Sequence, residues 1–322
     1  MSGTEVERSR TAQPTTAELD ELFESLKNWG RWGPDDERGA LNHQTDAHRA
    51  HAASLVTDAA LVSLAHDLPL QPSVETPFPA HHHMLASGDA LDANGIAGYE
   101  ACGDYVGTQV HGLGITHIDA LSHMFVRGQM YGGRPAEEVR STGARSNTVM
   151  TLGDGLVGRG VLLDVPAVHG VAFLAATTAI GPDDLDAAEQ RQGITVGRGD
   201  FVVVSTGRDA RRADAHGRLD PIGAGLAGLH PDCLPWLHDR GVAVLGGDGI
   251  SDRMPLGATP MWPFPIHQIG IVAMGLHLVD NLHLAPLAAV CAERERWEFL
   301  LTVNPLRIPG ATGCPVNPVA LL

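Results

Sequence analysis

Three short runs of aliphatic residues constrain the fold more than any other feature of this sequence. They are GRGVLLDVPA (158–167), GDFVVVSTGR (199–208) and VAVLGGDG (242–249). Short apolar runs between turn residues are typical of β-strands buried on both faces. Helices are predicted at 181–193 and 231–241, each with a glycine after its last turn. This alternation predicts an α/β fold in which a mixed, barrel-like sheet forms the core of one domain.

The N-terminal segment predicts a disordered tail followed by a helix. Residues 1–14 are polar, and no apolar run there resembles a signal peptide. Thr15 and Glu18 have capping-box spacing, and apolar residues then recur at helical period to about Lys27. The folded domain is therefore expected to span 15–322.

Three further segments complete the predicted elements. Residues 61–70 alternate enough for a strand, 265–282 should run from helix into strand, and 284–301 should be mainly helical. The long apolar stretch 265–301 also predicts a homo-oligomer, either a dimer or a tetramer.

Charge and cysteine content exclude several classes of protein. The formal net charge of −16 disfavours nucleic acid and anionic membranes as partners and leaves a small-molecule substrate. The four cysteines are far apart in the sequence, which argues against a disulfide framework or a zinc knuckle. We expect a soluble, cytoplasmic protein.

The stretch HGLGITHIDALSH (111–123) contains the strongest candidate site. On a β-strand, residues two apart share a face, so His117 and Asp119 would project together and could bind one metal ion. A turn after Asp119 would bring His123 to the ion or to its bound water. His111 lies too far away on a straight strand, unless the neighbouring glycines form a bulge. Pairs of the type His-x-Asp are often only hydrogen-bonded. The surroundings here are apolar, however, and burial of these polar groups without partners would cost several kcal/mol.

The segment THIDALSH within this stretch resembles the core of the H-x-G-T-H-x-D-x-P-x-H signature of the cyclase-type metal hydrolases. This is the family of bacterial kynurenine formamidase and isatin hydrolase. Further blocks, such as LPWLHDRGVAVLGGDGISD and PLRIPGATGCPVNPVALL, resemble its larger branch. The resemblance implies a single domain with the swivelling β/β/α fold of that family.

The resemblance also implies roles for individual residues. His117 and Asp119 match metal ligands, and His123 matches the histidine that donates and accepts protons. His267 and Asp280 match a histidine and a glutamate that complete the metal centre. Because Asp280 is one carbon shorter than the family's glutamate, we expect one metal ion and regard a second as optional. Zn²⁺ and Mn²⁺ are the candidates.

The sequence departs from the signature at its first histidine. The family spacing puts that ligand at Leu113, so either His111 replaces it or His111 lies beside the substrate pocket. The usual glycine is Ile115 and the usual proline is Leu121.

Five more residues are weaker candidates for the substrate pocket. His81, His82 and His83 could form a lid, although an exposed polar loop explains them as well. Asp248 follows a predicted strand and is either a turn residue or part of the pocket wall. Arg208 could bind an anionic substrate or form a surface salt bridge.

These residues predict a hydrolase that uses a metal-activated water to cleave an amide or lactone carbonyl of a small cyclic or N-acyl substrate. A non-haem Fe(II) oxygenase is an alternative, because His-x-Asp with a distant histidine also describes its ligand triad. No arginine or lysine lies between His267 and Glu293 to bind its co-substrate, which counts against it. A non-catalytic metal-binding relative is the third possibility.

Overall fold

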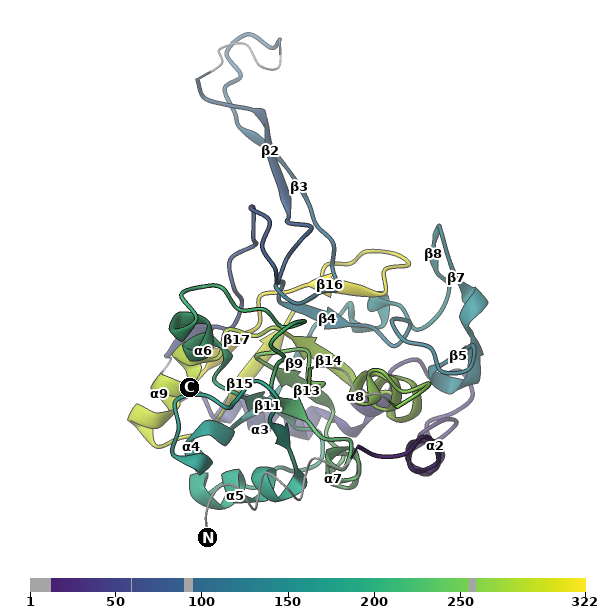
Figure 1. Ribbon diagram of the computed structural model, residues 1–322. Helices are drawn as coiled ribbons and strands as arrows, with labels where there is room; N and C mark the ends of the chain where they lie inside the picture. The colour runs from purple at the N-terminus through teal and green to yellow at the C-terminus, as the bar shows by residue number, and fades with distance from the viewer. Residues whose placement is uncertain (1–12, 59, 90–94, 255–258) are drawn as a thin grey trace.

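A nine-stranded sheet forms the centre of the computed structural model (Figure 1). The structure describes residues 13–58, 60–89, 95–254 and 259–322. The strand order is β1-β17-β15-β9-β11-β13-β14-β4-β16. Strands β9, β11, β13 and β14 are parallel to one another, and the strands on both sides of them pair antiparallel. The sheet curls into a half-barrel, which confirms the predicted mixed α/β fold.

The strands of this sheet are β1 (Leu61–Ser63), β4 (His117–Asp119), β9 (Leu156–Asp164), β11 (Phe201–Ser205), β13 (Val244–Gly247), β14 (His277–Asp280), β15 (Glu298–Val303), β16 (Gly313–Pro315) and β17 (Val319–Leu321). The paired short strands are β2 (His81–Ala86) with β3 (Gly103–Gly107), β5 (Gln129–Met130) with β6 (Arg134–Pro135), β7 (Val139–Arg140) with β8 (Gly143–Ala144), and β10 (Ala179–Ile180) with β12 (Gly228–Leu229). The helices are α2 (Thr16–Ser25), α3 (Asp46–Ser54), α4 (Val165–His169), α5 (Pro182–Gln192), α6 (Arg208–Asp214), α7 (Cys233–Arg240), α8 (Pro265–His267), a π-helix (Gln268–Met274) and α9 (Ala285–Arg294). Within the residues that the structure describes, no helix has the length and apolar character needed to cross a membrane.

The parallel strands are buried on both faces, as their apolar runs predict. In β11, Val202 and Val204 belong to one hydrophobic cluster, whereas Phe201 and Val203 belong to the other. Helices α5, α7 and the π-helix contribute to the first cluster, and α9 contributes to the second. Side chains that alternate along a strand therefore reach two separate cores.

The four strands predicted with bounds are all shorter than expected, and two of them end next to helix or proline signals. Strand β9 ends at Asp164, whose carboxylate accepts a hydrogen bond from the Ala167 backbone N–H and caps α4. Pro166 lies in the first turn of that helix, where a missing N–H costs nothing. Strand β1 ends at Ser63, well before Pro69, which has no N–H for a ladder.

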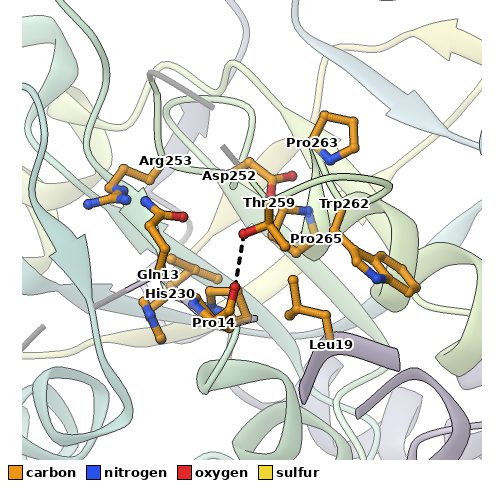
Figure 2. Close-up of a pocket in the computed structure, with 12 residues that line it drawn as sticks. Gln13, Pro14, Leu19, His230, Asp252, Arg253, Thr259, Trp262, Pro263 and Pro265 are labelled. Atoms are coloured by element: carbon orange, nitrogen blue, oxygen red, sulfur yellow. Dashed lines mark hydrogen bonds between the residues drawn. The ribbon is translucent and has the colours of Figure 1, made fainter. Parts of the chain in front are cut away.

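The first helix has the predicted capping box, since the Thr15 hydroxyl accepts from the Glu18 N–H and the Glu18 carboxylate accepts from the Thr15 N–H. It ends at Ser25. Most of the predicted tail, residues 1–12, lies outside the described residues. Pro14 is fixed on the domain, because its carbonyl accepts a hydrogen bond from the Thr259 hydroxyl at 2.9 Å (Figure 2).

The apolar stretch 265–301 changes from helix to strand, as predicted, and then to helix α9. The helix predicted over 284–301 ends at Arg294, and the chain enters strand β15 at Glu298. Residues 266–282 are buried, so this segment forms core within the chain. Its apolarity therefore needs no subunit contact, and the homo-oligomer stays a prediction. The hairpin of β2 and β3 instead projects from the body of the molecule (Figure 1) and exposes Met84, Tyr105 and Val106.

Arg208 links the loops that surround the carboxyl ends of the parallel strands. Its side chain is 2% exposed. The guanidinium donates to Glu75 Oε1 at 2.7 Å, to Asn281 Oδ1 at 2.6 Å, to the Asp248 carbonyl at 2.9 Å and to the Leu113 carbonyl. It is thus neither a surface salt bridge nor open to an anionic substrate.

Removal of this guanidinium should destabilise the fold. We expect Arg208→Met to lower the free energy of unfolding by ~3–5 kcal/mol, because Glu75 and Asn281 lose a buried partner. Urea denaturation would measure the change. Arg140→Met is the control, since Arg140 is exposed and should change stability by less than about 0.5 kcal/mol. Equal stability of the two variants would contradict this role.

Candidate metal centre

The residues predicted as ligands come together on β4 and β14, next to the edge strand β16. Strand β4 places His117 and Asp119 on the same face, two residues apart. Strand β14 pairs antiparallel with β4, and its register sets Asp280 directly opposite His117. His267 ends α8 and reaches the same point, with Nε2 at 3.2 Å from Asp280 Oδ2.

Asp119 lies at the centre of this group and is completely buried. Its Oδ1 is 2.8 Å from His111 Nδ1 and 3.5 Å from His117 Nε2. Its Oδ2 is 3.5 Å from His267 Nε2 and 4.0 Å from His123 Nε2. Two ligands of a tetrahedral ion lie about 3.3–3.6 Å apart, because each is 2.0–2.2 Å from the metal. The separations to His117 and His267, both 3.5 Å, fit ligands of one ion better than hydrogen bonds.

Several polar atoms at this point have no hydrogen-bond partner among the described residues. They are both carboxylate oxygens of Asp119, Asp280 Oδ1 and His111 Nδ1. The close approach of His111 to Asp119 therefore lacks the angle of a hydrogen bond. Such unsatisfied groups are expensive to bury, and a bound cation is an ordinary way to satisfy them.

The histidines are oriented by their other ring nitrogens. His117 Nδ1 donates to the Ile115 carbonyl at 2.8 Å, which leaves a lone pair on Nε2 for a metal. His267 Nδ1 lies 2.6 Å from Asp252 Oδ2, and His111 Nε2 lies 3.2 Å from the Thr312 hydroxyl. Metal-binding histidines are typically held in this way.

The charge balance also indicates a cation. Asp119, Asp252 and Asp280 are at most 2% exposed. In the described part of the chain, these three carboxylates form ion pairs only with histidines. Burial disfavours protonated His267, but the carboxylates, led by Asp280, outweigh it and raise the His267 pKa well above its usual range. A metal ion would supply the positive charge that this group otherwise draws from a proton.

His111 reaches the cluster through a loop and not through the predicted strand bulge. Residues 108–115 form no strand, and β4 begins only at His117. Gly313 in β16 makes room for the imidazole, because a Cβ at that position would lie 2.7 Å from His111 Cε1. The His111 ring stacks on His123 with centroids 3.6 Å apart. Leu113, where the family spacing expects a ligand, lines the cavity instead.

A cavity of about 460 Å³ opens onto this cluster. His123 lies at its base, and burial lowers the His123 pKa to about 4, although the Asp119 charge acts against this. The walls are mostly apolar and include Met124, Ile250 and Phe264. The volume is within the range of small-molecule sites.

Other candidate residues lie elsewhere. His81, His82 and His83 form β2 in the projecting hairpin (Figure 1), and they are exposed. Asp248 accepts hydrogen bonds from the Thr206 and Arg208 backbone N–H groups and caps the turn after β11. The structure therefore brings neither group into the cavity within this chain.

Sequence reasoning missed Asp252 and Gly313. Asp252 contacts His267 and also lines a small hollow of about 30 Å³, which has too little space for a substrate (Figure 2). Its carboxylate accepts from the Ile266 and His267 backbone N–H groups and so fixes the start of α8. Its position at the end of the family-like block LPWLHDRGVAVLGGDGISD was the one signal in the sequence that pointed to it.

The fold and the cluster define a protein with a buried His/Asp centre near the edge of a mixed α/β sheet. The family model described as "Putative cyclase" matches residues 62–252. A crystal structure of a novel cyclase is 30% identical in sequence, with a TM-score of 0.82, and the match covers 93% of this chain and 99% of that chain. The chain belongs to the cyclase family.

Two isatin hydrolases have a similar fold at lower identity. One, bound to the product analogue thioisatinate, is 20% identical, covers 82% of this chain and 93% of its own, and has a TM-score of 0.58. Isatin hydrolase A from Ralstonia solanacearum is 21% identical, covers 86% and 97%, and has a TM-score of 0.57. No curated protein matches the sequence.

Loss of a central ligand should abolish metal retention. We expect purified His117→Ala and Asp119→Asn proteins to contain no stoichiometric metal, because each loses an atom at the centre of the cluster. Elemental analysis after desalting would measure this. Asp232→Asn is a matched control, since Asp232 pairs with His230 and is 68% exposed. Normal metal content in either site variant would show that the site is misplaced.

His111 should contribute to metal affinity as a ligand. We expect His111→Ala to weaken binding at least about 10-fold, which is the lower limit for even an indirect partner of a metal. Gly313→Ala should weaken it too, because the added Cβ would displace the imidazole. Competitive titration with a chromophoric chelator would give the dissociation constants. An unchanged constant with reduced activity would make His111 a substrate-pocket residue.

Proposed function

We propose that this protein is a metal-dependent hydrolase that cleaves an amide or lactone carbonyl of a small cyclic or N-acyl substrate. The observation that supports it best is the group of unsatisfied buried atoms from Asp119, Asp280 and His111 at the base of an apolar cavity. Similarity of fold to isatin hydrolases points to the same kind of bond.

The donors fit one or two divalent ions. His111, His117 and Asp119 offer ligand atoms within 4.8 Å of one another, and so do Asp119, His267 and Asp280. The two groups share Asp119, whose Oδ1 faces the first and whose Oδ2 faces the second. We propose Zn²⁺ or Mn²⁺ in the first group, with the second group able to hold another ion. A bound ion would supply an activated water and polarise the scissile carbonyl.

His123 is the proposed proton acceptor and donor. Its low pKa keeps the imidazole neutral at pH 7, and a neutral imidazole accepts a proton from an attacking water. Its stacking on His111 holds the ring at the cavity base, beside the carboxylate of Asp119. The protonated ring can then donate to the leaving nitrogen or oxygen. No covalent bond to the protein is needed.

The cavity walls favour an apolar ring or acyl group. Leu113, Met124, Ile222, Met254 and Phe264 line it, whereas its polar atoms come from the residues of the cluster. A substrate that fits would bury its apolar part against these side chains and present its carbonyl to the cluster.

The oxygenase alternative does not fit the sheet. Those enzymes usually have an all-antiparallel double-stranded barrel, whereas β9, β11, β13 and β14 are parallel here. A non-catalytic relative would have no use for a cavity of about 460 Å³ beside the cluster. Turnover without oxygen would exclude the oxygenase, and any metal-dependent turnover would exclude the non-catalytic relative.

The test is hydrolysis by protein loaded with Zn²⁺ or Mn²⁺, under argon, of isatin, an N-formyl arylamine and an aryl lactone. We expect turnover of at least one of them, lost on chelation and restored by metal. His123→Asn should retain metal and lower kcat by about 10²–10⁴, since it removes only proton transfer. Full activity of His123→Asn would contradict its role. Absence of turnover in this panel with metal bound would contradict the proposed substrate class.

A further inference from the structure

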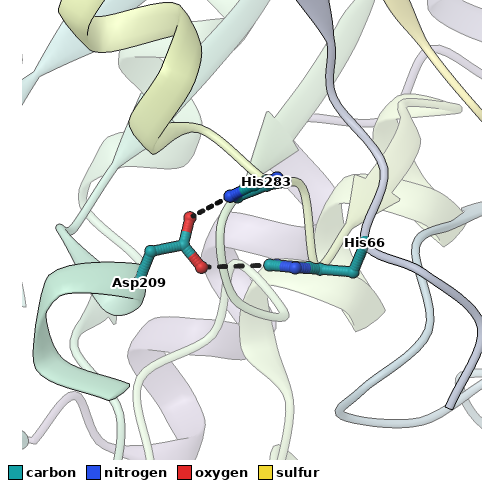
Figure 3. A group of neighbouring side chains, drawn as sticks. All are labelled: His66, Asp209 and His283. Atoms are coloured by element: carbon teal, nitrogen blue, oxygen red, sulfur yellow. Dashed lines mark ion pairs between the residues drawn. The ribbon is translucent and has the colours of Figure 1, made fainter. Parts of the chain in front are cut away.

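A second group of potential ligands lies outside the proposed active site. His66, Asp209 and His283 offer ligand atoms within 4.8 Å of one another, and the two imidazoles flank one carboxylate (Figure 3). They come from three segments: the loop after β1, the start of α6, and the link between β14 and α9. We propose that these three residues bind a divalent transition-metal ion such as Zn²⁺, in a structural site separate from the active site.

The distances fit coordination better than hydrogen bonding. His66 Nε2 is 3.4 Å from Asp209 Oδ1, and His283 Nε2 is 3.7 Å from Asp209 Oδ2. A good N–H···O hydrogen bond has a donor–acceptor distance of about 2.7–3.2 Å. Ligands of a four-coordinate zinc ion lie roughly 3.3–3.6 Å apart, a range that includes the His66 distance, and the His283 distance lies just above it. In the proposed active site, the Nε2 atoms of His117 and His267 also lie 3.5 Å from the carboxylate oxygens of Asp119.

The His66 imidazole is in the form that binds metal. Burial lowers the His66 pKa to about 4, with the Arg212 charge acting in the same direction and Asp209 against it. The neutral ring leaves a lone pair for an ion. His66 and His283 stack with centroids 4.6 Å apart, so both Nε2 atoms lie on the same side of the carboxylate (Figure 3).

Asp209 retains capacity for an ion despite its other contacts. Arg212 donates to Oδ1 at 2.9 Å, and the Ala285 N–H donates to Oδ2 at 3.4 Å. Each carboxylate oxygen accepts at two lone pairs, so one per oxygen remains. Arg212 also pairs with Glu75, which offsets its repulsion of a cation. Asp209 lines a hollow of about 230 Å³, which gives solvent and ions access to it.

A bound ion would fasten the segment after β1 to the domain. His283 N–H donates to the Leu64 carbonyl at 2.8 Å, and His66 N–H donates to the Thr116 hydroxyl at 3.2 Å, so the backbone is already held beside the site. Binding to the folded state alone stabilises it in proportion to the logarithm of ion concentration over Kd. Micromolar Zn²⁺ should thus raise the melting temperature.

The test is a titration of metal-free protein with micromolar Zn²⁺, with bound zinc counted by elemental analysis after desalting. We expect His66→Asn/His283→Asn to bind one equivalent fewer than the unmodified protein and to lose the Zn²⁺-dependent rise in melting temperature that belongs to this site. His230→Asn is a matched control, because within the described residues His230 forms an ion pair with Asp232 but belongs to no group of three potential ligands. Equal stoichiometry in the double variant and the unmodified protein would overturn the proposal.

Two further measurements locate the ion. His81→Asn/His83→Asn should bind the full number of equivalents, and loss of the extra ion in that variant would assign it to the hairpin and overturn the site. If the His66 and His283 substitutions prevent folding, an anomalous difference map of the unmodified protein at the zinc edge decides the question. A peak between the two imidazoles and Asp209 is expected, and its absence from zinc-loaded crystals would also overturn the site.

Discussion

The burial of the Asp119 carboxylate, on a strand paired on both sides, is the constraint on which the rest of the site depends. A carboxylate without solvent needs positive charge and donors, and imidazoles surround it in the described part of the chain. Its neighbours His117 and Asp280 are fixed by the pairing of β4 with β14, so the backbone ladder sets the geometry. The two cores on either side of the sheet are extensive and apolar, and their burial offsets the cost of burying these charges.

The local parts of this site could be predicted from the sequence, whereas the long-range parts could not. His117 and Asp119 could be predicted as neighbours, because the period of a strand is two. The approach of His111 could not be predicted correctly, since it depends on the missing side chain of Gly313 in a distant strand. Family resemblance, and not periodicity, supplied His267 and Asp280.

The same difference between local and long-range information applies to prediction of the fold. Apolar runs and capping residues identified several central elements, including β9, β11, β13 and α5, but missed most of the short strands. Apolarity alone could not show whether 265–301 meets another subunit or the chain's own core, and it proved to be core through residue 282. The histidines of 81–83 carry no periodic signal, so only the tertiary structure places them on the hairpin. A run of histidines is thus weak evidence for a functional site, whereas the spacing of a histidine and an aspartate on one strand is strong evidence.

The two histidine clusters are linked through residues that flank the ladder between β4 and β14. Thr116 precedes His117 and donates its hydroxyl to the carbonyl of Asn281, which follows Asp280. The same hydroxyl accepts the N–H of His66. An ion held by His66 would therefore restrain the residue next to His117. Two hydrogen bonds through Thr116 thus connect the outer site to the backbone beside the inner ligands, so the position of that backbone depends on contacts from both sides of the ladder.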